Sequence, residues 1–144
     1  MLFQNILVPY DDSKYSFHAF KIAAEIAKKF NSKLTVVTII PKSYYTGWYA
    51  DYRAETSMLN KQKKSATKAL SNVQSMAKKR GIDITIDVLE SNLIVKKIVS
   101  IAKSKKVDLI IMGAHGRTGW DKLILGSVTD GVSHRVRCPV LIVR

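Results

Sequence analysis

Short apolar runs alternate with longer amphipathic stretches along the chain. The apolar runs predict five strands, at residues 2–9, 34–40, 82–89, 107–112 and 139–143. Between them, apolar residues recur at spacings of three and four. This spacing predicts helices that start after Asp12 or Ser13, near residue 55, after Ser91 or Asn92, and at residue 127. The alternation predicts an α/β fold: a five-stranded parallel sheet with helices on both faces.

Length and composition restrict the fold to one ordinary domain. The chain has 144 residues, of which 47% are hydrophobic, so we expect a single domain over residues 1–144. No apolar run approaches the roughly 20 residues that span a bilayer, so we expect no membrane segment. The first ten residues lack the pattern of a signal peptide, and Cys138 is the only cysteine. We therefore expect a cytoplasmic protein without an internal disulfide.

The chain is strongly basic, with 24 Lys and Arg against 11 Asp and Glu and a net charge of +13. Twelve of these cations and only three acids fall within residues 61–106, on the solvent faces of the two predicted helices there. No recognition motif or stacking platform accompanies them, so we do not expect nucleic-acid binding. Two interpretations of these basic residues remain: they form a solvated surface, or they form a basic face that meets an acidic partner.

A glycine-bearing loop follows the fourth predicted strand. Ligands of such sheets bind at the carboxyl ends of the strands, where the strand order reverses. Gly113 and Gly116 leave the strand, and Gly126 and Ser127 open the last helix. Glycines permit a positive φ and a close backbone approach, and the free N–H groups of a helix start favour phosphate. Two alternatives need no ligand: the glycines turn the chain, and Ser127 forms a capping box with Asp130.

Several segments resemble the universal stress protein family, namely the opening ILVPYDDS, the strand VDLIIMG, the loop GAHGRTG with LGSVT, and the end CPVLIVR. ATP-binding members of the family carry G-x2-G-x9-G-[ST], which Gly113, Gly116, Gly126 and Ser127 meet in full. The resemblance covers essentially the whole chain. It implies a Rossmann-like fold of the adenine nucleotide alpha hydrolase type and the binding of ATP or another adenine nucleotide. It also implies a magnesium or manganese ion held mainly through the phosphates.

The resemblance also implies roles for individual residues. Asp11 matches an acidic residue near the ribose and the metal, Pro9 shapes its turn, and the backbone of Ile39 matches the position that recognises adenine. Two residues lie beside the ribose, Met112 and Gly113, and five match the triphosphate site: Gly116, Gly126, Ser127, Val128 and Thr129. Arg117 is a further phosphate candidate because its guanidinium is permanently charged. The remaining candidate, Tyr10, stands where a small residue is common; its ring either stacks near the base or covers the turn.

Two features depart from the family or fall outside its motif. The segment that opens the third predicted helix lacks the Gly-x-Pro of many relatives, and we expect Asn92 to replace the glycine through a left-handed φ. Residues 41–52 hold five aromatic side chains at the ligand edge of the sheet. They predict either a lid or partner contact, or a flap that packs on its own helix.

No catalytic constellation and no metal-ligand spacing stands out in the sequence. We therefore expect an ATP-binding universal stress protein that acts as a nucleotide-dependent switch in the stress response. The alternatives are a slow ATPase or phosphotransferase, for which no positioned base is visible, and a basic interaction protein that works without nucleotide. We also expect a homodimer formed through the last strand, by Val140, Leu141, Ile142 and Val143, because an unpaired apolar edge needs cover.

Overall fold

The computed structural model describes residues 2–42, 52–117 and 125–144. Five parallel strands form one sheet in the order β3-β2-β1-β4-β5. The strands span Asn5–Pro9 (β1), Lys33–Ile40 (β2), Ile84–Glu90 (β3), Leu109–Gly113 (β4) and Val140–Val143 (β5). The predicted five-stranded parallel sheet is therefore confirmed, and each predicted strand matches an observed one to within a few residues.

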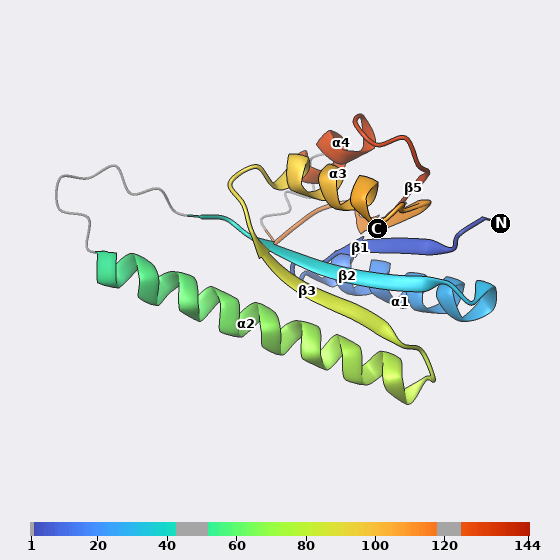
Figure 1. The fold of residues 1–144 in the computed structure, drawn as a ribbon, viewed down its shortest axis with the longest axis horizontal. Coiled ribbons are helices and arrows are strands. Elements are labelled where there is room, and N and C mark those ends of the chain that lie inside the picture. Colours follow the sequence, from blue (N-terminus) through green and yellow to red (C-terminus); the bar gives the residue numbers. More distant parts are fainter. Residues whose placement is uncertain (1, 43–51, 118–124) are drawn as a thin grey trace.

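Helices cover both faces of the sheet (Figure 1). The helices α1 (Lys14–Phe30) and α2 (Tyr52–Lys79) enclose one core cluster, which includes Ile6, Phe20 and Leu70. The helices α3 (Ile94–Ser104) and α4 (Ser127–Ser133) enclose the other cluster, which includes Leu7 and Ile98. Since β1 alternates its side chains between the two clusters, it is buried on both faces, as a central parallel strand requires.

The helix ends follow the expected chemistry at α1 and depart from it at α3. Ser13 caps α1 by accepting a hydrogen bond from the backbone N–H of Ser16 at 3.1 Å, and Asn31 ends it with a left-handed φ of 55°. At α3 the cap position is Leu93, whose backbone N–H donates to the hydroxyl of Ser91. Neither Ser91 nor Asn92 caps this helix directly. The prediction of a left-handed φ at Asn92 is also wrong.

The long helix α2 is anchored mainly through its second half. Its buried side chains are Leu70, Val73 and Ala77, and the ion pair between Arg80 and Glu25 ties its end to α1. The first half extends past the sheet (Figure 1), and Met58 there is 64% exposed. Most of the aromatic segment, residues 43–51, lies outside the described residues. None of the helices in the described part combines the length and the hydropathy that crossing a bilayer requires.

Candidate functional site

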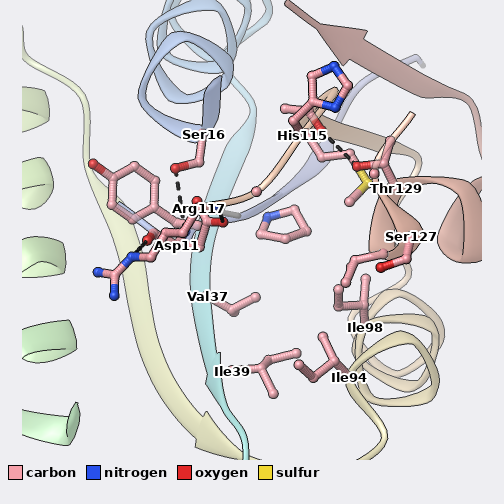
Figure 2. Close-up of a pocket in the computed structure, with 17 residues that line it drawn as sticks. Asp11, Ser16, Val37, Ile39, Ile94, Ile98, His115, Arg117, Ser127 and Thr129 are labelled. Atoms are coloured by element: carbon pink, nitrogen blue, oxygen red, sulfur yellow. Dashed lines mark hydrogen bonds between the residues drawn. The ribbon is translucent and has the colours of Figure 1, made fainter. Parts of the chain in front are cut away.

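The chain leaves β1 toward β2 and β3, then returns to place β4 on the other side of β1. This reversal of strand order opens a crevice beyond the carboxyl ends of β1 and β4. A cavity of about 670 Å³ lies there (Figure 2). All twelve candidate residues line this cavity: Pro9, Tyr10, Asp11, Ile39, Met112, Gly113, Gly116, Arg117, Gly126, Ser127, Val128 and Thr129.

One end of the cavity is apolar. Val37 and Ile39 of β2 face Ile94 and Ile98 of α3 across it (Figure 2). Tyr10, directly after β1, donates its backbone N–H to the carbonyl of Val37 at 2.7 Å, and among the described residues this is the last backbone hydrogen bond that joins this end of β1 to β2. In a parallel ladder, residues two apart direct their backbone groups the same way. The N–H and C=O of Ile39 therefore point past the end of β1, and no loop or turn hydrogen bond among the described residues uses them.

The other end of the cavity is formed by the start of α4. Gly126 occupies the cap position, and no side chain caps the helix. The first bond of the helix runs from the N–H of Asp130 to the carbonyl of Gly126, so the N–H groups of residues 127–129 precede it. The capping box of Ser127 with Asp130 is therefore wrong. The hydroxyl of Ser127 forms no hydrogen bond with any other described residue, and it is directed at the cavity (Figure 2).

The three motif glycines serve close packing. None of them has a positive φ, so the expectation that these glycines provide one is wrong. A Cβ on Gly113 would lie 2.6 Å from the Cβ of Tyr15, because α1 passes directly over the end of β4. A Cβ on Gly116 would lie 2.9 Å from Oδ2 of Asp11, and one on Gly126 would lie 3.3 Å from the carbonyl oxygen of Ala114. Gly113 is thus required by the fold itself.

Thr129 holds the loop in position. Its hydroxyl donates to the carbonyl of Gly113 at 2.7 Å, and its side chain is almost fully buried. The hydroxyl proton is therefore not free for a phosphate, although the family resemblance places Thr129 at the triphosphate site. Of the two hydroxyls, only that of Ser127 is available as a donor.

Asp11 and Arg117 tie the turn after β1 to the loop after β4. Oδ1 of Asp11 accepts the N–H of Ser13 at 3.0 Å, and Oδ2 accepts the N–H of Arg117 at 3.1 Å. Nε of Arg117 donates to the backbone carbonyl of Asp11 at 2.6 Å, and its guanidinium lies 4.0 Å from Asp12. Asp11 therefore closes the turn before the capping residue Ser13 and also reaches the glycine loop. The guanidinium of Arg117 extends toward this turn, away from Ser127 (Figure 2).

Tyr10 covers the turn. Its ring belongs to the core cluster between the sheet and the helices α1 and α2, whereas Ile98 belongs to the cluster on the opposite face. The ring is therefore not placed to stack on a ligand between Ile39 and Ile98. Burial, and then the neighbouring carboxylate of Asp12, raises the pKa of the Tyr10 hydroxyl to about 12.

Five lining residues were not among the candidates: Ser16, Val37, Ile94, Ile98 and His115. Ile94 and Ile98 are four residues apart on one helical face, which is the only signal the sequence offered for this wall. The ring of His115 packs edge-on to Tyr15 with centroids 5.1 Å apart, which fits a residue that orients the loop. Within the described residues, no three His, Cys, Asp or Glu side chains gather closely enough to hold a metal ion.

An open parallel sheet with a cavity at its point of strand reversal defines a Rossmann-like α/β protein. Residues 2–144 match the model of the Universal stress protein family, and the chain belongs to that family. It is 35% identical over 143 residues to the universal stress protein MJ0531 of Methanocaldococcus jannaschii, covering 99% of this chain and 83% of that one.

Solved structures agree with this assignment. The universal stress protein UspA from Lactobacillus plantarum superposes with a TM-score of 0.91 at 25% identity, over 100% of this chain and 99% of that chain. A universal stress protein solved in complex with cAMP superposes with a TM-score of 0.74 at 27% identity, again over 100% and 99% of the two chains. The fold and the family of the chain therefore rest on independent sequence and structural similarity.

Proposed function

We propose that the cavity binds an adenine nucleotide, with ATP as the ligand, and that the chain acts as a nucleotide-dependent switch in the stress response. The observation that carries this proposal is the two-ended cavity: an apolar slot at one end and uncapped helix N–H groups at the other. Its volume of about 670 Å³ lies within the range of small-molecule sites, about 300–1,000 Å³. The relative solved with cAMP supports the choice of an adenine nucleotide.

The apolar slot fits a flat base. Ile39 and Ile98 supply apolar surface on two sides, so that a purine would lose its contact with water there. The outward-facing N–H and C=O of Ile39 offer one donor and one acceptor, which complement the edge of adenine. This pairing favours adenine over an apolar ligand of the same size, because an apolar ligand would leave both backbone groups unsatisfied.

The opposite end fits an anion. The N–H groups of residues 127–129 and the hydroxyl of Ser127 supply donors, and the positive end of the helix dipole adds to them. Asp11 is the one acidic residue among the described lining residues, and both of its oxygens already accept backbone N–H groups. A magnesium or manganese ion would therefore be held mainly by the phosphates, whose negative charge it would neutralise.

Binding is favoured over rapid hydrolysis. Of the described lining residues, Asp11 and His115 are the ones that could act as a base. The carboxylate of Asp11 is engaged in two hydrogen bonds, and the ring of His115 packs against Tyr15. Since general-base catalysis needs a group positioned on the attacking water, any ATP turnover should be slow.

We further propose that the switch is a homodimer formed through β5. This strand ends the sheet order, so one of its edges has no neighbouring strand among the described residues, and Leu141 on it is 40% exposed. Unpaired apolar edges are usually covered in native proteins, and pairing with a second copy would cover this one.

Isothermal titration with ATP, ADP, AMP and cAMP, in the presence of magnesium, tests the nucleotide proposal. Ile94→Glu places a carboxylate against the apolar slot and should weaken ATP binding roughly tenfold or more. Leu93→Glu is the matched control, because Leu93 is adjacent, 59% exposed and not part of the cavity wall. No binding of any of the four nucleotides, or an equal loss in both variants, would refute the proposal. Released phosphate, followed in the same samples, distinguishes a switch from a slow ATPase.

A further inference from the structure

A second hollow lies between α1 and α2, on the face of the sheet opposite α3 and α4. It has a volume of about 500 Å³, and its walls come from residues 10–17 and from residues 65–76 of α2. We propose that this hollow, the α1–α2 groove, binds an acidic, amphipathic peptide segment of a partner protein. The proposal does not depend on nucleotide binding, since apart from Tyr10 the groove shares no lining residue with the cavity.

The floor of the groove is apolar and incompletely covered. Phe17 of α1 and Ala69, Val73 and Met76 of α2 form it. Val73 is buried in the core beneath, whereas Met76 remains 37% exposed. Side chains of a partner that lie over Met76 would remove this apolar surface from water. The floor therefore sets the first requirement for a binding segment, which must present apolar side chains along one face.

The rim of the groove is positive. Lys14 and Lys68 line it from opposite helices, and residues 14–30 and 54–79 together contain ten lysines and two glutamates. One carboxylate also lines the groove, that of Asp12, but it lies 4.0 Å from the guanidinium of Arg117 and 3.4 Å from the hydroxyl of Tyr10. The opposing charge is thus partly neutralised. Carboxylates that flank the apolar side chains of the partner would complement the two lysines.

The same groove is poorly suited to nucleic acid. Base stacking needs an open aromatic face, but the ammonium of Lys21 lies 5.1 Å from the centre of the Phe17 ring and covers it. The ring of Tyr10 is buried in the core, with 5% of its surface exposed. An amphipathic helix laid into a groove between two helices uses both the apolar floor and the charged rim. Ser65 and Asn72 add side-chain polar groups that bond to no other described residue.

Fluorescence anisotropy on the full chain tests this proposal. The probe is a labelled helical peptide of roughly 18 residues with Leu at positions i, i+3, i+4 and i+7 of each repeat and Glu elsewhere. A peptide of the same composition in scrambled order and a labelled DNA duplex serve as comparison ligands. We expect the amphipathic peptide to bind, with an affinity that falls as salt rises, and the scrambled peptide to bind at least about fivefold more weakly.

Two matched pairs of variants locate the binding site. Lys68→Glu, in the groove, should weaken binding roughly fivefold, while Lys61→Glu, exposed on the same helix outside the groove, should change it less than about twofold. Met76→Gln should weaken binding, while Met58→Gln, which is outside the groove, should not. Thermal unfolding of each variant shows whether it is folded.

Three results would overturn the proposal. The first is the absence of peptide binding to the wild-type chain. The second is an equal loss in Lys61→Glu and Lys68→Glu, or equal binding of the scrambled peptide, which would show attraction to the basic surface in general. The third is tighter binding of the DNA duplex than of the peptide, which would make this face a polyanion surface instead.

Discussion

Replacing Thr129 with Val separates the structural part of the glycine loop from its ligand-binding part. The change keeps the branched shape of the side chain and removes one hydroxyl. That hydroxyl donates to the carbonyl of Gly113 at 2.7 Å, in a position where Thr129 is 3% exposed. The variant therefore leaves a carbonyl at the end of β4 without its side-chain donor, and little water can reach it. We expect the folded state to become less stable.

The size of the effect follows from the burial of the bond. Removing one partner of a buried hydrogen bond costs about 1–3 kcal/mol, whereas an exposed one is replaced by water at little cost. In a domain of this length, that loss corresponds to a melting temperature lower by roughly 2–12 °C. Ser133→Ala is the control on the same helix, because the hydroxyl of Ser133 donates to the carbonyl of Asp130 at 2.8 Å in an exposed position. We expect it to cost less than about 0.5 kcal/mol.

Urea unfolding, followed by circular dichroism, measures both variants against the wild type. An unfolding free energy of Thr129→Val that falls no further than that of Ser133→Ala would refute the reasoning. Such a result would mean that the bond between Thr129 and Gly113 does not hold the loop, and Thr129 would again be a candidate phosphate donor. Repeating the urea titrations with ATP shows whether the nucleotide stabilises the variant as much as the wild type, and so whether the lost bond also affects the cavity.

Three further predictions test other parts of the structure. Gly113→Ala puts a Cβ 2.6 Å from that of Tyr15 and should cost about 1–3 kcal/mol, whereas Gly126→Ala, with its nearest contact at 3.3 Å, should cost less; equal losses of unfolding free energy would contradict this. The pKa of Tyr10 is raised from 10.0 to about 12, so its contribution to stability is complete below pH 10 and is lost between pH 10 and 12; Tyr10→Phe should lose less stability over that interval than the wild type, and an identical pH profile would count against it. Leu141→Glu should convert the proposed dimer to a monomer in sedimentation velocity at micromolar concentration, and a wild-type monomer would reject the dimer outright.

The elements of the fold were predictable because their patterns are strong. Continuous apolar runs such as residues 34–40 mark strands buried on both faces, and each helix repeats its apolar residues over several turns. The start of α3 was harder to predict, since Ser91, Asn92 and Leu93 offer several local solutions of similar energy. In the structure, the backbone N–H of Leu93 donates to the hydroxyl of Ser91, and Leu93 is the residue directly before the helix. Such choices depend on the packing of the whole helix, which the local sequence does not encode.

One part of the candidate site could be predicted from the sequence and another part could not. Residues that follow β1 and β4 meet at the strand reversal in any sheet of this order, so the positions of Asp11 and Gly116 followed from topology. The wall formed by Ile94 and Ile98 did not follow, because it depends on how α3 lies across the sheet. The direction of the Tyr10 ring could not be predicted either, since a single residue after a strand has no periodicity from which its face can be read.

The motif G-x2-G-x9-G-[ST] combines two kinds of requirement. Gly113 is needed because α1 crosses the end of β4, and this need exists whether or not a ligand binds. The neighbouring Thr129 is likewise engaged with the fold. What the fold leaves free is the hydroxyl of Ser127 and the helix N–H groups behind it. A chain could therefore keep Gly113 without binding nucleotide, so the first glycine is weak evidence for a ligand. The uncapped start of α4, combined with the outward-facing backbone of Ile39, is the stronger evidence, because no cap, loop or turn hydrogen bond among the described residues uses either of them.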